Sequence, residues 1–277
     1  MDNRVSIRNV SKIYGKGCDS CIELTGPEYG RNRCPKCGTI VACADIGFDV
    51  YPGEILGIVG ESGSGKSTLV KTLYFDEAPT TGEFYLQDFE EGLSNVYGLS
   101  SLQKRYIRNH LMGMVYQNPH LGLNLDYSAG GNIAEKLLMA DWNHVGAIRE
   151  RAKELLTKTE IPIERMDDKP KYFSGGMQQR VQISKALANN PPLLLLDEVT
   201  TGLDVSVQAS VLDLIRQIGR ELGISMIVVS HDFSVIRMLT NRTIVMKNGR
   251  IVEQGLTDQI MEDPQHAYTQ LLINSLI

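Results

Sequence analysis

The segment from Gly60 to Ser67 constrains the fold of this chain more than any other, because its glycine spacing requires a particular kind of turn. It follows the apolar run 55–59, which is short enough to be a buried strand, and precedes the stretch 68–72, which can continue as a helix. A strand, a glycine-rich turn and a helix with the spacing G-x-x-x-x-G-K-S form a loop whose backbone N–H groups cradle phosphates. The segment therefore predicts an α/β nucleotide-binding domain rather than an ordinary turn.

Three kinds of side chain in this loop suit a polyphosphate. Gly60, Gly63 and Gly65 leave out the Cβ atoms that would keep the backbone N–H groups away from the phosphates. Lys66 supplies a positive charge for the β- and γ-phosphates, and Ser67 offers a hydroxyl oxygen to Mg²⁺. We therefore expect the loop to bind a nucleotide together with Mg²⁺.

Composition and charge exclude several classes of protein. The 277 residues can bury a sizeable core, and the formal net charge of −5 argues against a broad nucleic-acid-binding or lipid-facing surface. No apolar run approaches the ~20 residues of a membrane helix, and the N-terminus lacks the apolar region of a signal peptide. We expect a cytoplasmic protein that binds no nucleic acid and reaches a membrane only through a partner.

Four of the five cysteines form two Cys-x-x-Cys pairs, Cys18 with Cys21 and Cys34 with Cys37, and twelve residues separate the pairs. Each pair can wrap one metal ion, and two pairs complete a tetrahedral thiolate site of the kind that zinc prefers. Few apolar residues lie between positions 15 and 38. A structural zinc ion would supply the missing folding free energy, about 10 kcal/mol or more in small zinc modules.

The alternatives for this stretch are four free thiols in a loop or a redox pair. No thioredoxin-like strand and helix are expected around either pair, which disfavours the redox interpretation. The charges of the stretch nearly cancel, so we expect the insert 15–40 to contact a protein or to stiffen the domain. The fifth cysteine, Cys43, lies on an apolar strand and is interpreted as a core residue.

Two candidate site residues follow predicted strands. Tyr14 comes after the alternating segment 5–10, and it either stacks on a nucleotide base or packs on the strand edge. Gln117 ends the apolar strand 112–116, where it either reaches a metal ion or a water, or caps the strand. The other elements expected before position 171 are strands at 46–50 and 82–87 and a mainly helical region from 118 onward.

A second anion site is predicted at the start of a helix that reaches position 188. Ser174 is a good N-cap, and Gly175 and Gly176 leave N–H groups free at the positive end of the helix dipole. The alternative is a plain capped helix.

Acidic side chains follow the four leucines 193–196, which form a continuously buried strand. Asp197 would hold Mg²⁺ through water, and Glu198 would orient or deprotonate an attacking water. His231, after the strand 226–229, is either structural or a sensor of the γ-phosphate. The remaining elements expected are a helix at 205–220, a hairpin turning at 248–249 and two short helices within 257–277.

In their order along the chain these motifs resemble the ATP-binding-cassette (ABC) ATPase family, and the resemblance covers nearly the whole sequence. It implies the family's P-loop NTPase fold in a single domain, 1–277. This is an α/β fold with a mixed or parallel core sheet, an antiparallel β subdomain and a helical signature subdomain at 118–180. The resemblance further implies that two cassettes sandwich two ATP molecules, and that each signature faces the γ-phosphate held by the other subunit.

The resemblance also implies a role for each matching residue. Tyr14 is similar to the adenine-stacking aromatic, and Asp204 to the D-loop aspartate. Catalytic roles are implied for Lys66, Gln117 (Q-loop), Glu198 and His231 (switch histidine). Nucleotide contacts are implied for Tyr14, for the Walker A residues Gly60, Ser62, Gly63, Ser64, Gly65, Lys66, Ser67 and Thr68, and for the signature residues Ser174, Gly175 and Gly176. The implied Mg²⁺ ligands are Ser67, Gln117 and Asp197.

Two positions depart from the common family pattern. Met177 stands where the signature usually has Gln, a variant of the oligopeptide and nickel importer branch. Val199 stands where Pro commonly follows the catalytic glutamate. Strings such as 128–133, 173–182 and 255–258 resemble the cassette subunits of the carbon–phosphorus lyase system of phosphonate breakdown.

We therefore expect a dimeric, zinc-containing ATPase that docks on the core subunits of a carbon–phosphorus lyase and drives its conformational cycle. A second ABC subunit could take the place of the second copy. One alternative is the ATP-binding subunit of an oligopeptide or nickel importer, which would need a membrane permease near 117–127. Another is an ATP-gated scaffold or nucleic-acid binder, which the acidic balance disfavours.

Overall fold

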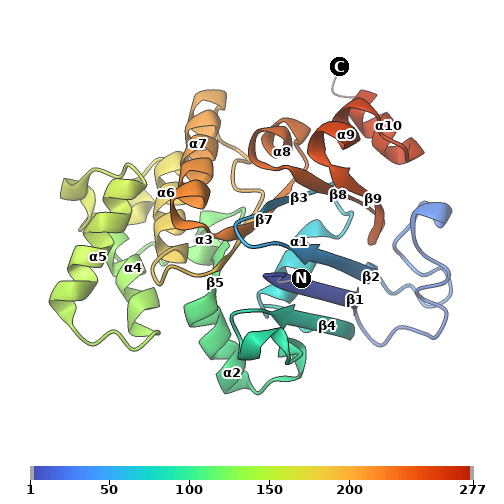
Figure 1. Cartoon of the computed structure of the whole chain (residues 1–277), viewed down its shortest axis with the longest axis horizontal. Helices are drawn as coiled ribbons and strands as arrows, with labels where there is room; N and C mark the ends of the chain where they lie inside the picture. Colours follow the sequence, from blue (N-terminus) through green and yellow to red (C-terminus); the bar gives the residue numbers. More distant parts are fainter. Residues whose placement is uncertain (1–2, 275–277) are drawn as a thin grey trace. The chain divides into compact units, whose positions relative to one another are not determined.

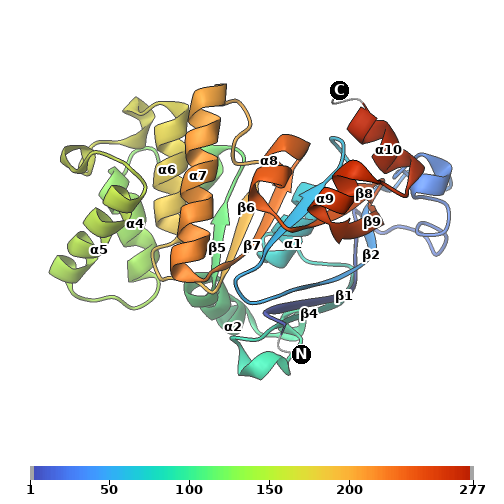
Figure 2. The same cartoon turned by 45° about the horizontal axis from the view of Figure 1, so that its top comes forward.

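The computed structural model describes residues 3–274, and these fall into two compact units. The first unit comprises the residues up to Ser100 together with those from Ile227 onward, and the second runs from Ser101 to Met226. Figures 1 and 2 show the helices and strands of each unit in two views.

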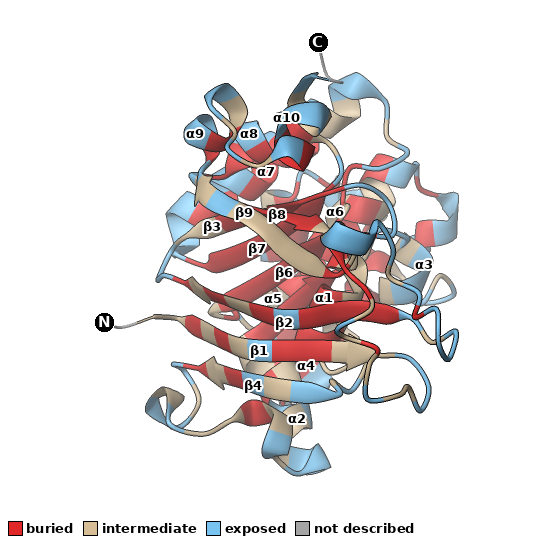
Figure 3. Ribbon diagram, turned by 90° about the vertical axis from the view of Figure 1, so that its right-hand side faces the viewer, coloured by how far each residue is buried: buried red, intermediate tan, exposed pale blue. Residues whose placement is uncertain are grey.

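An antiparallel sheet in the first unit has the strand order β2-β1-β4. Its strands are β1 (Val5–Ile13), β2 (Val41–Val50) and β4 (Thr81–Leu86). β1 lies in the middle, where Val5 is opposite Val50 on one side and Leu86 on the other. Buried and less buried positions alternate along parts of these strands, such as 44–50 of β2, as expected for a sheet with one face on the core. Figure 3 shows the burial along the strands. The predicted antiparallel subdomain is therefore confirmed.

β1 and β2 extend further than the alternating pattern predicted. The predicted strands were 5–10 and 46–50, whereas β1 continues to Ile13 and β2 begins at Val41. Asn9 and Asp45 have positive φ angles of 49° and 54°, and the pairing register shifts beside both residues. Such bulges break the alternation of side chains, so the pattern recovered only part of each strand.

β3 (Ile55–Val59) and α1 (Lys66–Leu73) flank the phosphate loop, as predicted. β3 is parallel to β8 (Arg242–Lys247), which pairs antiparallel with β9 (Arg250–Leu256). β7 (Ser225–Ser230) lies on the other side of β3. Asn248 and Gly249 have φ angles of 45° and 78°, as a two-residue hairpin turn requires, and this confirms the predicted hairpin.

The other α-helices described in this unit are α8 (Phe233–Leu239), α9 (Thr257–Glu262) and α10 (Ala267–Asn274). Short 3₁₀ helices lie at Glu90–Gly92 and Val96–Gly98. α9 and α10 confirm the two helices predicted for the tail, whose last three positions lie outside the described residues. α8 was not predicted, because its seven residues make too few turns for a periodic pattern to stand out. It begins after Asp232, whose carboxylate accepts a hydrogen bond from the N–H of Ser234 at 2.8 Å.

The cysteine-rich insert leaves the sheet after β1 and rejoins it at β2. Its regular structure is a 3₁₀ turn at Pro27–Tyr29 and two isolated bridges, Gly26 with Arg31 and Arg33 with Ile40. A small apolar cluster joins it to the sheet, in which Cys21 and Cys34 are buried together with Val41 and Ala44. Two of the four buried members are thiols, so the insert packs around its cysteines rather than around a core of its own.

The second unit is mainly helical around two parallel strands, β5 (Met112–Val115) and β6 (Leu193–Asp197). Its helices are α2 (Ser101–Tyr106), α3 (Pro119–Gly122), α4 (Ala129–Leu138), α5 (Val145–Lys158), α6 (Gly175–Ala186) and α7 (Val205–Leu222). A π-helical segment, Ile107–Leu111, follows α2 and was not predicted. α4 lies beside α5, and α6 beside α7 (Figure 2).

Most of the apolar residues that predicted helices here become buried, whereas Leu138 of α4 is exposed. In α5 the buried ones include Ile148, Ala152 and Leu155, at three- and four-residue spacing. All five residues of β6 are buried, as predicted for a strand covered on both faces. Across residues 3–274, no helix combines the length and apolar composition that crossing a bilayer requires.

Candidate functional site

The phosphate loop holds a buried ammonium group. The side chain of Lys66 is buried, and its Nζ donates hydrogen bonds to the carbonyl oxygens of Gly60 at 2.7 Å and Glu61 at 3.1 Å. Lys66 is also the first residue of α1, so its charge lies at the helix N-terminus, where the first backbone N–H groups have no acceptor within the helix. The charge and these donors together make the turn an anion-binding site.

Glycine is needed at three positions of the loop, for two different structural reasons. A Cβ on Gly60 would lie 2.2 Å from the carbonyl oxygen of Met246, and one on Gly65 would lie 2.1 Å from that of Ala42. Both positions are therefore packed against neighbouring backbone. Gly63, with φ +83°, has no described atom within 4 Å of its Cβ position, so it needs glycine for its conformation alone.

A hydroxyl from α10 supports the start of the loop. The N–H of Glu61 donates a hydrogen bond to the Oη of Tyr268 at 3.1 Å. Burial raises the pKa of Tyr268, so the phenol stays neutral. The Nζ of Lys247 lies 4.4 Å from the centre of the tyrosine ring. Tyr268 was not predicted as a site residue, because nothing in its local pattern distinguishes it from a packing residue.

Two further contacts support the middle of the loop. The N–H of Gly249, in the β8–β9 turn, donates to the carbonyl oxygen of Ser64 at 2.9 Å. The Nδ2 of Asn32, in the cysteine-rich insert, donates to the carbonyl oxygen of Gly63 at 3.3 Å. Neither contact was predicted. The phosphate loop is therefore supported both by the cysteine-rich insert, which precedes it in the sequence, and by the β8–β9 turn, which follows it.

Tyr14 is held through its hydroxyl group, and its stacking on a base stays a prediction. Its Oη donates to the carboxylate of Glu77 at 2.7 Å and lies 3.4 Å from the Oγ1 of Thr68, so the ring is tied to the region where α1 begins. Burial and the Glu77 carboxylate raise the pKa of Tyr14. The residue is nevertheless 39% exposed, which leaves part of the ring accessible for a stacking partner.

In the second unit, Gln117 and Glu198 lie together. The Nε2 of Gln117 donates to the Oε2 of Glu198 at 3.1 Å, and the hydroxyl of Thr201 lies 3.3 Å from the same oxygen. Glu198 has a φ of +47°, a conformation that non-glycine residues seldom adopt and that is concentrated at functional sites. Asp197, the last residue of β6, is buried.

The predicted signature forms the N-terminus of α6. The Oγ of Ser174 accepts a hydrogen bond from the N–H of Met177 at 3.3 Å, which confirms the predicted N-cap. A Cβ on Gly176 would lie 2.4 Å from the Cγ1 of Val207, whereas one on Gly175 would make an ordinary 3.5 Å contact with Leu203. Gly176 is thus required by helix packing, and Gly175 is not.

A hollow of about 430 Å³ opens beside this helix end. It is lined by Glu160, Pro162, Arg165, Ser174, Gly176, Met177, Arg180, Ser206, Val207 and Ser210. Asp204 caps the neighbouring α7 by accepting from the N–H of Val207 at 3.0 Å, and this hydrogen bond lowers the pKa of Asp204. In the first unit, His231 follows β7 and is exposed.

The four cysteines of the insert come together as the spacing predicted. Their Sγ atoms all lie within 4.8 Å of one another, and the distances are 3.6 Å for Cys18–Cys21, 3.8 Å for Cys18–Cys34 and 3.3 Å for Cys21–Cys37. A tetrahedron of sulfurs with a Zn–S length of about 2.3 Å has edges of about 3.8 Å. The arrangement therefore fits one zinc ion.

The surroundings of the cluster also suit a metal. All four thiols are free of disulfides in the described chain. The N–H of Cys18 points at the sulfur of Cys21 at 3.0 Å, and the N–H of Gly38 donates to the carbonyl oxygen of Cys34 at 2.8 Å, which gives two tight knuckles. Hydrogen bonds from Thr39 lower the pKa of the Cys37 thiol to about 6, which favours the thiolate that binds metal. Cys43 is buried in β2, as predicted for a core residue.

Comparison with known proteins identifies relatives of this chain. A family profile described as "ABC transporter" matches residues 43–201, a region that begins after the four-cysteine cluster. The chain is 47% identical over 234 residues to the phosphonates utilization ATP-binding protein PhnK of Escherichia coli (strain K12), covering 84% of this chain and 91% of that protein. It is 36% identical over 242 residues to the oligopeptide transport ATP-binding protein OppF of Lactococcus lactis, covering 86% of this chain and 72% of that one.

Solved structures show the same fold. The dimeric post-hydrolysis state of the ATP-binding cassette MJ0796, bound to ADP and phosphate, matches with a TM-score of 0.75 and 29% identity. The match covers 91% of this chain and 98% of that one.

Proposed function

Because the chain belongs to the ABC transporter family, whose cassettes bind and hydrolyse ATP, we propose that it is the Mg-ATP-driven subunit of a carbon–phosphorus lyase system. In this proposal it docks on the core subunits of the lyase, and its ATP cycle drives conformational change during the breakdown of organic phosphonates. The similarity to PhnK supports this pathway over others.

The phosphate loop with its buried Lys66 is the observation that carries the ATPase function. When ATP binds, the ammonium of Lys66 would donate to the β- and γ-phosphates in place of the carbonyl oxygens of Gly60 and Glu61. The adenine would stack on Tyr14, the phosphates would be held by Gly60, Ser62, Gly63, Ser64, Gly65, Lys66, Ser67 and Thr68, and the whole chain 1–277 would act as one cassette.

Mg²⁺ would be held by Ser67, Gln117 and Asp197, whose hydroxyl, amide and carboxylate oxygens are the donors that this hard cation prefers. When bound, the ion neutralises charge on the phosphates. Glu198, whose carboxylate accepts from Gln117, orients the attacking water, and His231 contacts the γ-phosphate.

The cassette would act as a dimer that closes on ATP. Ser174, Gly175 and Gly176, at the N-terminus of the twelve-residue helix α6, would face the γ-phosphate bound by the partner copy. Loss of that phosphate removes the bridge and lets the two copies separate. We further propose a structural zinc ion on Cys18, Cys21, Cys34 and Cys37, supported by their sulfur–sulfur distances.

Pull-down with the Glu198→Gln variant tests the lyase assignment. Immobilised Glu198→Gln with Mg-ATP is expected to capture purified lyase core subunits, while Lys66→Ala, which lacks the phosphate contact, is not. Failure of Glu198→Gln with Mg-ATP to capture the core subunits would contradict the assignment. The protein would be cytoplasmic and would bind no nucleic acid.

The second candidate is the ATP-binding subunit of an oligopeptide or nickel importer. It is favoured by the similarity to OppF and by Met177 in the signature. In that case the chain would pair with a second ABC subunit or copy beneath a permease. Peptide-stimulated ATPase activity with a reconstituted permease would support it.

A further inference from the structure

We propose that a zinc ion on the four cysteines holds the phosphate loop in shape, so that metal loading sets the affinity for nucleotide. This inference rests on the ATPase function and zinc site proposed above. It adds a regulatory link between two sites that lie in the same unit of the protein.

The first connection starts at the second knuckle. Two backbone hydrogen bonds, each 2.8 Å long, hold Cys34. Its N–H donates to the carbonyl oxygen of Thr39, and its carbonyl oxygen accepts from the N–H of Gly38. Asn32 lies two residues earlier, and its carbonyl oxygen accepts from the N–H of Val41 at 2.8 Å. The side chain of Asn32 then donates to Gly63 of the phosphate loop at 3.3 Å. A displaced Cys34 would therefore displace the donor to the loop.

The second connection is the strand that leaves this knuckle. Val41, at the start of β2, packs in the small cluster with Cys21 and Cys34. The next residue, Ala42, presents its carbonyl oxygen to Gly65, so closely that a Cβ there would lie 2.1 Å away. Because these two backbones are in tight contact, the position of β2 limits where the loop can lie.

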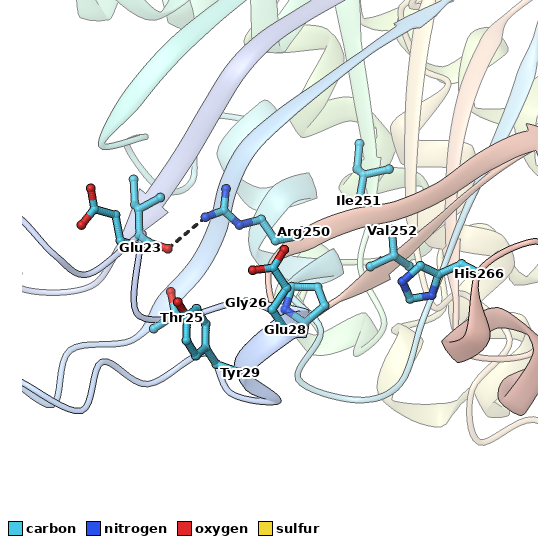
Figure 4. A pocket seen from close by; sticks show the side chains of 11 residues that line it. Glu23, Thr25, Gly26, Glu28, Tyr29, Arg250, Ile251, Val252 and His266 are labelled. Atoms are coloured by element: carbon cyan, nitrogen blue, oxygen red, sulfur yellow. Dashed lines mark hydrogen bonds between the residues drawn. The ribbon is translucent and has the colours of Figure 1, made fainter.

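The third connection runs through Arg250 (Figure 4). One guanidinium nitrogen donates to the carbonyl oxygen of Ile22, just after the first knuckle, at 3.0 Å, and another pairs with Asp45 of β2. The preceding residue, Gly249, donates to Ser64 of the loop at 2.9 Å. Its carbonyl oxygen accepts from the N–H of Ala44 at 2.8 Å. The first knuckle is thus tied to the turn that supports the loop.

The insert needs the metal to hold these positions. A cavity of about 520 Å³ separates its first loop, including Tyr29, from β9 and His266, as Figure 4 shows. The insert therefore does not gain its position by close packing on β9, but by the Arg250 contacts, by the hydrogen bond from Val41 to Asn32, and by the apolar cluster in which Cys21 and Cys34 take part. Without a metal, the four thiols make only weak hydrogen bonds in place of four zinc–sulfur bonds. The zinc-free insert would therefore lose the contact of Asn32 with Gly63 and that of Ile22 with Arg250.

The experiment compares nucleotide affinity with and without zinc in the full chain. Zinc is counted by metal analysis, removed with a chelator, and the buffer is exchanged before Mg²⁺ and a fluorescent ATP analogue are added. We expect one zinc ion per chain and about five- to tenfold weaker binding of the analogue after removal, the effect of losing one or two hydrogen bonds to the loop. Re-addition of zinc is expected to restore the affinity.

Two variants distinguish the effect of zinc binding from the effect of the hydrogen bond between Asn32 and Gly63. Asn32→Ala keeps all four thiols and is expected to retain zinc, yet to bind the analogue about fivefold more weakly and to respond less to zinc removal. Lys36→Ala, at an exposed position between Cys34 and Cys37, is the matched control and should behave as the wild type in both states. If zinc removal unfolds the chain, the Asn32→Ala result decides alone.

Each contrary result has a distinct meaning. Equal affinity in the zinc-loaded and zinc-free chain, or in Asn32→Ala and the wild type, overturns the coupling and leaves the ATPase function intact. Absence of zinc, with four titratable thiols in the purified chain, overturns the site and the coupling. Absence of nucleotide binding in every state overturns the proposed ATPase function as well.

Discussion

Gln182 of α6 clamps the backbone of Tyr116 with both ends of its amide. Its Oε1 accepts the N–H of Tyr116 at 2.6 Å, and its Nε2 donates to the carbonyl oxygen of the same residue at 3.1 Å. Tyr116 immediately precedes Gln117, which contacts Glu198. Gln179 of the same helix also donates to the carbonyl oxygen of Tyr116, at 3.3 Å. The helix that carries the signature is therefore connected through two buried glutamines to the backbone next to Gln117.

Replacing this amide is expected to cost stability and to disturb Gln117. Gln182→Leu removes a partner from two backbone groups of Tyr116, so we expect a loss of about 2 kcal/mol in the free energy of unfolding together with a lower ATPase rate. Urea unfolding and phosphate release measure the two effects. Gln217→Leu, on the exposed face of α7, should change stability by less than about 0.5 kcal/mol. Equal stability of the two variants would contradict the clamp.

Glu198→Gln is expected to retain ATP and lose turnover. The amide keeps the size of the side chain and can still bond to its neighbours, but it cannot accept a proton from water, so we expect a rate at least ~10³-fold lower. Size-exclusion chromatography with Mg-ATP should show an accumulated dimer. Glu150→Gln, at an exposed position of α5, serves as the control. Turnover close to that of the wild type would remove Glu198 from its role.

Tyr268→Phe tests the support from α10. Loss of the hydroxyl leaves the N–H of Glu61 without this acceptor, and we expect about fivefold weaker nucleotide binding, equivalent to ~1 kcal/mol. The aromatic ring remains, so the helix should stay in place. Tyr172→Phe, at an exposed position of the second unit, should bind nucleotide as the wild type does. A Tyr268→Phe chain with unaltered affinity would show that the loop holds its shape without this contact.

The phosphate loop was predictable because its requirements are local. β3, the glycines and α1 are contiguous, so spacing alone located the site. Tyr268 meets Glu61 across 207 positions of sequence, and the contact depends on where α9 and α10 pack. A single sequence holds no local signal for such a pairing. The same holds for Asn32, which lies in a segment whose shape depends on its cysteines.

The cysteine cluster shows the opposite case. The two Cys-x-x-Cys pairs predicted a four-thiol site, and the structure brings the sulfurs together, because each pair folds as a short knuckle whose geometry is set by nearby residues. The strands around it were predicted less well. Asn9 and Asp45 place bulges in β1 and β2, and a bulge interrupts the alternation from which a strand is recognised.

Adjacent glycines of the signature should respond differently to alanine. Gly176→Ala brings a Cβ to 2.4 Å from Val207, so we expect a loss of about 1–3 kcal/mol in the free energy of unfolding. Gly175→Ala meets only an ordinary contact and should leave that quantity unchanged or slightly higher. If α6 faces a phosphate in the dimer, Gly175→Ala should nevertheless lower ATP hydrolysis. Normal hydrolysis by a stable Gly175→Ala chain would count against that role.

Lys136 gives the protein a predictable dependence of stability on pH. Its side chain is buried in α4, and its Nζ donates to the carbonyl oxygen of Arg108 at 2.5 Å. Burial, with smaller contributions from the charges of Arg108 and Lys185, lowers the pKa of Lys136 to about 7, whereas an unfolded lysine titrates near ~10.4. Between these values the unfolded chain binds more protons than the folded chain. The free energy of unfolding therefore rises with pH over this window, by at most about 1.4 kcal/mol per pH unit. Below pH ~7 the lysine is protonated in both states, so it adds no pH dependence there.

Lys136→Met isolates that contribution, because methionine has a similar length and no titrating group. We expect the stability of the wild type relative to Lys136→Met to increase steadily from pH 7 to 9.5 in urea unfolding. Lys153→Met, which removes a partly exposed lysine of α5 that pairs with Glu150, should show a constant difference from the wild type over the same range. Parallel curves for the wild type and Lys136→Met would mean that Lys136 keeps an ordinary pKa, and that the hydrogen bonds its ammonium donates compensate fully for its burial.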